Sequence, residues 1–531
     1  MDKPQSTITH KIARATAIIA ILASLSKVLG FVREMTLAYV FGASSVTDAY
    51  LVALTVPGIL FSVLGGALTV AAVPVFTSYA ARNRNDEGWQ VFRIFTTVLS
   101  LLIIIVVLLA IPFARQVVWL IAPGLDSSTA LLASRLLAVM LPGVLFFSLA
   151  NLFYGLLNAN NVFSIPAAGP VVTNILIIIS ILAGYFFGIF AVAVGTLAGY
   201  MAAMLLQLPA LRRVGFRYRF SIDLQNPGVK HTFSLMAPLM IGTGISQAYL
   251  VIDRILASGL AEGSISALNY ASKLVLLPQG VIVMAVGTAV FPALATRAAS
   301  GYLGQYVDTL RRSLNMVLLI TLPCGVGLAV LRDPIVRLLF ARGAFDERAA
   351  VMTSFALLCF SVGLIGQCLN PVITRGFYAL QDTVTPVKIG VMTVGLNLVF
   401  ALILVGPMKH GGLALANSIA AVFNVIVLLC VLKKKVTELD IASLKMCFFK
   451  LLAASAVMAA AVAVLDRTLV YYIPGPGIFL GLRVLLDIGA GVIIYFSACA
   501  ALKLDEFYYL QNIGKNAAGR YLGILFSRSA G

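Results

Sequence analysis

The sequence predicts an all-α polytopic membrane protein with 14 transmembrane helices, arranged as two parallel six-helix lobes followed by two C-terminal helices. Hydrophobic residues make up 61% of the 531 residues and charged residues only 11%, whereas about a quarter of a soluble chain is charged. The mean hydropathy is +1.02. The apolar runs are continuous, unlike the alternating strands of a membrane β-barrel, so helices are expected to cross the bilayer. This composition excludes a soluble enzyme.

Runs without Asp, Glu, Lys or Arg mark most of the crossings, because a charge in the hydrocarbon is costly. The charge-free stretch Leu136–Leu211 is long enough for three crossings, with turns expected at Asn158–Asn161 and Gly184–Gly188. The last two runs are shorter than a bilayer and are expected to extend into flanking residues. In chain order, the expected spans are one near Ile12–Val40, Ala49–Ala81, Ile94–Ala114, three in Leu136–Leu211, Thr232–Ile252, Leu274–Thr296, Ser313–Leu331, Ala349–Thr374, Ile389–Met408, Gly411–Leu432, Leu451–Leu465 and Ile488–Leu502.

The charge balance predicts the orientation in the membrane. The chain has 38 Lys and Arg against 20 Asp and Glu, a formal charge of +18. In a membrane protein, such an excess indicates cytoplasmic loops that follow the positive-inside rule rather than binding of nucleic acid. If both termini are cytoplasmic, the basic clusters Arg212-Arg213 and Lys433–Lys435 lie inside, together with most other basic residues. We therefore expect this topology and no nucleic-acid partner.

The sequence matches itself at an offset near 221, which indicates two repeats of six spans. Because six is even, both repeats enter the membrane in the same sense, and transporters built in this way hold substrate between their lobes. The expected domains are an N-lobe at residues 1–220, a C-lobe at 221–436, and spans 13 and 14 with a cytoplasmic tail at 437–531. The matched positions include Arg33 with Arg254, Gly42 with Gly263, and Arg212-Arg213 with Lys434-Lys435.

Charged residues within or at the ends of the expected spans are the candidate site. A charge at the centre of a membrane helix costs about 2.5–3.5 kcal/mol on insertion scales, so it normally faces a cavity or a partner. The alternative for Arg33 and Arg254 is that they lie near span ends and extend to the membrane surface. The cations of this set are Lys27, Arg33, Arg254 and Lys273, and the anions are Glu34, Asp48 and Asp253.

The excess of cations in this set predicts an electropositive cavity suited to a phosphate or pyrophosphate. A cationic-drug exporter would present carboxylates instead. The sequence shows no catalytic constellation, Walker A loop or Rossmann fingerprint, so no enzyme, catalytic residue or cofactor is expected. His10, His231 and His410 are far apart, and no metal site is expected.

Several motifs resemble those of the MurJ (MviN) lipid II flippase family, of the MOP superfamily. The strongest is Gly376–Ile389 (GFYALQDTVTPVKI), followed by Gly411–Ala416. The resemblance covers nearly the whole chain. It implies that the protein moves a lipid-linked peptidoglycan precursor across the inner membrane by alternating access. The other matching segments are Lys27–Glu34, Phe41–Ala43, Thr47–Tyr50, Val73–Phe76, Asn158–Pro166 and Ala271–Pro292.

The resemblance also implies the site residues. Lys27 and Lys273 stand where well-known members have arginine, which keeps the charge but loses the bidentate fork. With Arg254 from the repeat, the expected substrate site has pyrophosphate held by Lys27, Arg33, Arg254 and Lys273, with Asp48 orienting or neutralising a cation. The positions that match functionally important family positions are Lys27, Arg33, Asp48, Lys273 and Lys388.

One departure from the family leaves the substrate open. Well-known members carry two arginines early in the second span, whereas Pro57–Ser62 here has no charge. The leading expectation is a monomeric lipid II flippase of the bacterial inner membrane, whose partners are undecaprenyl-pyrophosphate-linked glycan and membrane lipids. The alternatives are export of another polyprenyl-linked oligosaccharide and, from another class, a non-transporting scaffold of cell-wall synthesis.

Overall fold

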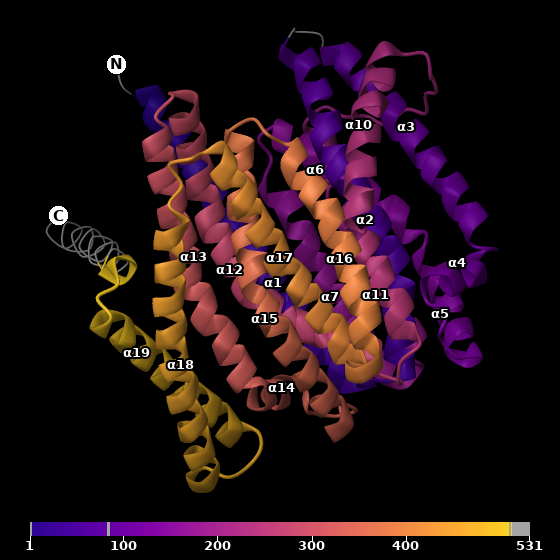
Figure 1. Ribbon diagram of the computed structural model, residues 1–531. Helices are drawn as coiled ribbons and strands as arrows, with labels where there is room; N and C mark the ends of the chain where they lie inside the picture. The colour runs from indigo at the N-terminus through magenta and orange to yellow at the C-terminus, as the bar shows by residue number, and fades with distance from the viewer. Residues whose placement is uncertain (1–2, 82–84, 509–510, 512–531) are drawn as a thin grey trace, which may run out of the picture. The chain divides into compact units, whose positions relative to one another are not determined.

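Helices form every regular element in the part of the chain that the computed structural model describes, residues 3–81, 85–508 and 511 (Figure 1). This confirms the predicted all-α membrane fold. The helices divide into two compact units. The first consists of residues 1–266 with 342–349, and the second of residues 267–341 with 350–531. The lobe boundaries expected at residues 220 and 436 stay a prediction.

In the first unit, most of the helices pack around α2 and α7. Helix α2 packs against α5, α6 and α10, while α1 packs against α7, and α7 against α8. The helices are α1 (Lys3–Phe41), α2 (Ser45–Ala81), α3 (Asn85–Ala110), α4 (Ala114–Ile121), α5 (Ser127–Met140), α6 (Gly143–Ala159), α7 (Ser164–Phe187), α8 (Ile189–Leu205), α9 (Leu208–Arg213), α10 (Pro227–Ser246) and α11 (Ala248–Ser258).

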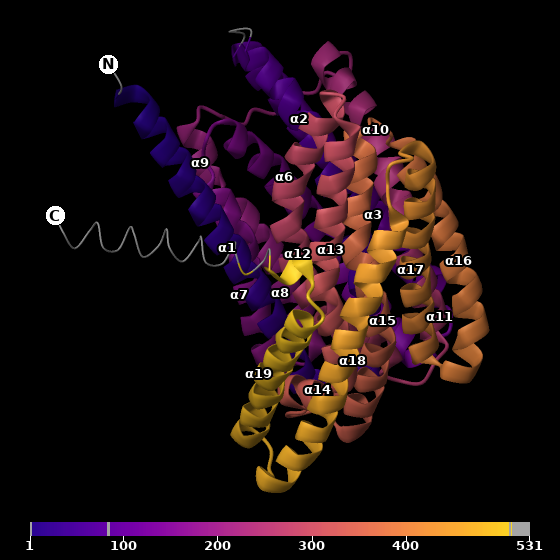
Figure 2. The ribbon, with the colours of Figure 1, turned by 60° about the vertical axis from the view of Figure 1, so that its left-hand side comes forward.

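In the second unit, helices pack against neighbours in sequence and, in one case, against a helix far earlier in the chain. Helix α16 packs against α17, and α18 against both α13 and α19. Figure 2 shows α18 and α19 side by side at the end of the chain. The helices are α12 (Ser264–Ala299, whose first turn belongs to the first unit), α13 (Leu303–Val330), α14 (Arg332–Phe340), α15 (Glu347–Ala379), α16 (Val384–Met408), α17 (His410–Lys435), α18 (Ile441–Tyr472) and α19 (Ile478–Ala501).

Eleven helices of the described ranges are long and apolar enough to cross a membrane, or 12 if a bent pair is counted as one span. The bent pair is α5 and α6, which meet at 41° across Pro142, where the sequence places a helix-breaking residue. Helices α1 and α12 lie at the predicted first and eighth spans, with 39 and 36 residues, but are not among the 11. The count of 14 stays a prediction.

The predicted turns of the charge-free stretch are confirmed. Helix α6 ends at Ala159 and α7 begins at Ser164, while Gly188, with a φ of 72°, separates α7 from α8. Glycine adopts such a left-handed φ without the steric cost that other residues meet. The last two helices are longer than the apolar runs that predicted them, with 32 residues in α18 and 24 in α19. The expectation that these spans extend into flanking residues is thus confirmed.

Left-handed backbone conformations recur at the offset of the sequence repeat. Positive φ angles at Gly42, Asn161 and Gly188 have counterparts about 220 residues later. Non-glycine residues rarely adopt this conformation, so its recurrence in both halves supports the internal repeat independently of the apolar runs. The counterparts are Gly263, Gln381 and Lys409, with φ angles of 82°, 59° and 52°.

Candidate functional site

Arg33 lies inside a polar network between α1 and α7. Its Nη2 atom lies 2.7 Å from Oε1 of Glu34, and its Nη1 donates a hydrogen bond of 3.2 Å to Oδ1 of Asn174. Asn174 in turn donates to the backbone carbonyl of Ser26, at 3.1 Å. Ser26 and Arg33 are seven residues apart on α1, so they share the face that packs against α7. The network thus holds the guanidinium two turns before α1 ends at Phe41.

Protein encloses most of the Arg33 side chain and nearly all of its partner Glu34. The side chain of Arg33 is 26% exposed and that of Glu34 is 6% exposed. The phenol groups of Tyr50 and Tyr200 lie near enough to interact electrostatically with Arg33. A partly exposed guanidinium that is held by a carboxylate and an amide is positioned to receive an anionic oxygen while keeping some of its donors.

Asp48 joins the start of α2 to the start of α12. Its Oδ2 accepts a hydrogen bond of 2.8 Å from the backbone N–H of Gly263, and its Oδ1 accepts one of the same length from the N–H of Ser266. The hydroxyl of Ser266 donates to the same carboxylate. Asp48 is 4% exposed, and it satisfies N–H groups that the first turn of α12 leaves without intrahelical partners. This buried carboxylate therefore caps a helix that begins 216 residues later.

Arg254 lies on α11 with two carboxylates as its charged neighbours, Asp253 and Asp48. Its Nε is buried and has no hydrogen-bond partner among the described residues, and the same is true of Oδ1 of Asp253. Buried polar atoms normally find partners, and a site where they do not is a candidate for a bound group. Of the predicted cations, Arg33 and Arg254 are thus both enclosed by the first unit.

The three predicted lysines have different surroundings. Lys27 is exposed on α1 and Lys388 is exposed on α16, whereas Lys273 is half-buried on α12. Of the six predicted substrate-binding residues, Lys27, Arg33, Asp48 and Arg254 belong to the first unit, and Lys273 and Lys388 to the second. Their action as one binding set stays a prediction.

The turn between α15 and α16 carries the strongest family motif and a second charged network. Asp382 forms an ion pair with Lys435 of α17 and accepts a hydrogen bond of 3.0 Å from the N–H of Thr385. The Lys435 ammonium also lies 6.0 Å from the centre of the Phe377 ring. The Lys435 ammonium and the Thr385 donors lower the pKa of Asp382. The motif thus fixes the start of α16, about one turn before Lys388.

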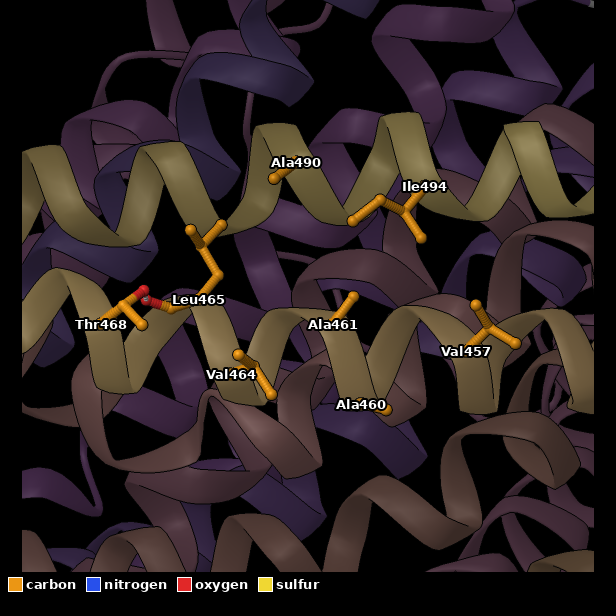
Figure 3. Close-up of a pocket in the computed structure, with 8 residues that line it drawn as sticks. All are labelled: Val457, Ala460, Ala461, Val464, Leu465, Thr468, Ala490 and Ile494. Carbon is orange, nitrogen blue, oxygen red and sulfur yellow. Dashed lines mark hydrogen bonds between the residues drawn. The ribbon is translucent and has the colours of Figure 1, made fainter.

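An apolar groove runs between α18 and α19 (Figure 3). Its volume is about 810 Å³, and it is shallow and widely open to its surroundings. A groove of this kind suits an alkyl or polyprenyl chain, because its walls offer almost no polar groups. The lining residues are Val457, Ala460, Ala461, Val464, Leu465, Thr468, Ala490 and Ile494.

Two parts of the polar framework were not predicted from the sequence. Asn174 is an uncharged residue in an apolar run, and nothing local distinguishes it from other asparagines. Asp466, Arg483 and Asp487 lie within α18 and α19, although the predicted apolar runs stop short of all three. The signal that could have revealed them is length, because a run too short for a bilayer must borrow its charged neighbours.

The fold is that of a multi-pass membrane transporter. It matches an inward-facing multidrug resistance MATE family transporter of the MOP superfamily at a TM-score of 0.64, with 16% identity, covering 79% of this chain and 98% of that chain. It matches a structure of the lipid II flippase MurJ in an inward closed conformation at a TM-score of 0.78, with 27% identity, covering 92% of this chain and 99% of that chain.

Sequence comparison narrows this class to one family. The family model described as "Lipid II flippase MurJ" matches residues 37–480. The lipid II flippase MurJ of Burkholderia cenocepacia is 30% identical over 421 residues, which are 77% of this chain and 82% of that protein. The probable lipid II flippase MurJ of Rhizobium meliloti is 34% identical over 420 residues, 77% and 78% of the two chains. The chain belongs to the MurJ family, which confirms the resemblance seen in its motifs.

Proposed function

We propose that this chain is a flippase that moves lipid II across the bacterial inner membrane by alternating access. The observation that carries the proposal is family membership over residues 37–480. This range includes Asp48 and Asn174, the partner of Arg33. In this proposal the protein acts as a monomer with both termini in the cytoplasm. It neither catalyses a reaction nor binds nucleic acid.

The proposed substrate-binding residues are Lys27, Arg33, Asp48, Arg254, Lys273 and Lys388. Arginine and lysine are the side chains that bind pyrophosphate oxygens best, arginine as a fork and lysine as a point charge. Arg33 is held in place by Glu34 and Asn174, so little entropy is lost when it binds an anion. Arg254 has a buried donor that a phosphate oxygen would satisfy.

The undecaprenyl tail would lie in the α18–α19 groove and in the surrounding lipid. Burying apolar surface contributes roughly 25 cal/mol for each Å², but a tail that leaves lipid for an apolar groove gains little of this. The groove would therefore guide the tail more than bind it tightly. Replacing Ala461 or Ala490 by Phe should fill the groove and slow translocation, while Ala453→Phe, on an exposed position outside the lining, should not.

The decisive test of the site is growth of cells depleted of their own flippase. The wild-type chain should restore growth, and Lys27→Ala combined with Lys273→Ala should not, because both variants remove a cation of the proposed pyrophosphate site. A matched control is Lys230→Ala combined with Lys445→Ala, at two exposed lysines outside the site. Normal growth with the first pair would refute the site assignment and would favour a non-transporting scaffold.

Another polyprenyl-linked glycan is the second candidate substrate, because the segment Pro57–Ser62 carries no charge. Purified protein in liposomes with labelled lipid II, compared with labelled polyprenyl-linked glycans of other kinds, separates the two. Faster translocation of lipid II supports the proposal. Translocation of the other glycans alone, together with rescue of a surface-polysaccharide defect, supports the second candidate.

A further inference from the structure

Three charged side chains meet inside the C-terminal helix pair, away from the proposed headgroup site. Asp466 lies on α18, and Arg483 and Asp487 lie on α19. Both helices are long and apolar enough to span a membrane. Asp487 is fully buried, with an exposed fraction of 0%, and it lies on the face of α19 that also buries Val484 and Gly491. A carboxyl group so placed in a membrane helix calls for a physical explanation.

The packing of the two helices accounts for the meeting of these side chains. A Cβ added at Gly491 would lie 3.1 Å from Val462, so the two helices come close at that layer. Asp487 is one turn before Gly491, and Asp466 is one turn after Val462. Because the two helices run antiparallel, both steps lead in the same direction along the pair, and the two carboxyl groups lie opposite each other one turn away from this contact. The two side chains are close enough to interact.

Arg483 completes the cluster. Its Nε lies 3.1 Å from Oδ1 of Asp466, and the two side chains are 12% and 24% exposed. Both oxygens of Asp487 are buried, and no donor from the described part of the chain reaches either of them. An unpaired buried carboxylate is costly, and in practice such a group takes up a proton or a cation instead.

Within the part of the chain that the structure describes, Arg483 is the one cation that acts on Asp487. Helix α19 packs against α13, α14 and α18, and the charged groups that act on Asp487 are Asp466 and Arg483. On α13, Asp308 pairs with Arg311 and Arg312. The charged residues of α14 are Arg332 and Asp333, which lie 3.9 Å apart, and Arg337.

The count of charges then identifies the occupant. Two carboxylates and one guanidinium carry a net charge of −1 when all three are ionised. Two carboxyl groups in contact cannot readily both ionise, and one of them retains a proton. One proton makes the cluster neutral and supplies the donor that Asp487 lacks.

We propose that Asp466, Arg483 and Asp487 form a proton-binding site, in which Asp487 holds the proton and donates it in a hydrogen bond to the Asp466 carboxylate paired with Arg483. Loss of the proton leaves a negative charge in a dry helix interface and weakens the packing of α18 on α19. Leu465, Thr468 and Ala490, close to the site in sequence, line the apolar groove. Binding of a proton to Asp487 therefore sets how tightly α18 and α19, the walls of the groove, pack against each other.

Infrared spectroscopy of the purified full chain in detergent tests the site directly. A protonated carboxyl group has a C=O stretching band that shifts in heavy water and that a carboxylate lacks. The spectrum of the wild type minus that of Asp487→Asn should contain this band. The variant Asp466→Asn should lose the band as well. The charges of Arg483 and of the remaining carboxylate, Asp487, then cancel, so no proton needs to be bound. Arg483→Gln should double the band, because both carboxyl groups must then be protonated.

Asp382→Asn is the matched control, since Asp382 is ionised and paired with Lys435, and it should leave the band unchanged. Absence of the band from the wild-type difference spectrum would overturn the proposal. Asn is nearly isosteric with Asp, so the variants keep the packing of α18 on α19. A band that sodium chloride removes at constant pH, while choline chloride does not, would also overturn it, because the site would then select sodium over the proton.

Discussion

The carboxylate of Asp48, in the first turn of α2, accepts a hydrogen bond of 2.8 Å from the backbone N–H of Ser266, in the first turn of α12. It also accepts one from the N–H of Gly263. A side chain of α2 thereby caps a helix that begins 216 residues later in the chain. The sequence alone shows only an aspartate at the start of an apolar span.

Removal of this cap should destabilise the protein. We expect Asp48→Ala to lower the free energy of unfolding by about 1–2 kcal/mol, as loss of an N-cap side chain does. Ser266→Ala should cost less, because it removes one hydroxyl donor and leaves both backbone N–H groups bound to Asp48. Chemical denaturation of the purified protein measures both changes. Equal stability of Asp48→Ala and the wild type would show that the cap is not needed for the fold.

Arg33 and Asn174 should behave as a coupled pair. The variant Asn174→Leu leaves an Arg33 donor without its partner and should reduce lipid II translocation in liposomes. The cost in stability should be below the roughly 1–3 kcal/mol of a fully buried donor, because the Arg33 side chain is partly exposed. Arg33→Lys keeps the charge but loses the planar fork that spans Glu34 and Asn174, and should reduce translocation similarly. Because residues in contact are not additive, the double variant should be little worse than either single one. Additive losses would argue against the coupling.

The close contact of α7 with α8 predicts a rescue experiment. A Cβ at Gly195 would lie 2.0 Å from the Cβ of Ser180, so Gly195→Ala should destabilise the protein by about 1–3 kcal/mol through overpacking. Adding Ser180→Gly removes the clashing Cβ and should restore part of the loss, although Ser180→Gly alone is mildly destabilising because glycine is a weak helix former. Thermal unfolding of the four proteins measures this. A double variant less stable than Gly195→Ala would contradict the contact.

The Asp382–Lys435 ion pair should make stability depend on pH on the acid side. Its pairing with Lys435 lowers the pKa of Asp382. A carboxylate whose pKa is lowered by folding stabilises the protein above its unfolded pKa, and this stability is lost as the pH falls through the folded value. Lys435→Gln should therefore lower the free energy of unfolding at neutral pH, by less than about 1 kcal/mol because the pair is partly exposed. The difference from the wild type should vanish as the pH falls through the range in which Asp382 takes up a proton.

Lys434→Gln is the control for this prediction, since Lys434 is a neighbouring exposed lysine and Asp382 pairs with Lys435. Unfolding midpoints between neutral and acidic pH, at low and high salt, measure the effect, and salt should weaken it. Identical curves for the wild type and Lys435→Gln would show that the pair contributes nothing to stability.

Most of the helical framework could be predicted because it depends on local properties of the chain. Charge-free apolar runs must be helical in lipid to satisfy their backbone groups, and the turns at Asn158–Asn161 and Gly188 lie where residues suited to left-handed backbone occur. The short helices α4 and α14 were not predicted, because eight or nine residues give too little periodic signal to separate a helix from a loop.

The candidate site was predicted only in part. Arg33 and Asp48 were singled out as charges in or beside apolar spans, and their burial agrees with that reasoning. Their partners could not be foreseen, because Asn174 carries no charge and the capped N–H groups of Gly263 and Ser266 are backbone atoms present at every position.

The composition of the chain and the spacing of its charges were enough to determine that it is a helical membrane protein. The free energy of transferring a residue from water to lipid depends mainly on the type of that residue. Tertiary structure decided which charges are paired, which remain available, and that Asp466 and Asp487 come together. Such pairing depends on the rotation of each helix about its axis and on its distance from the next helix. Contacts between residues far apart in the chain set both quantities, and a pattern along the chain does not encode them.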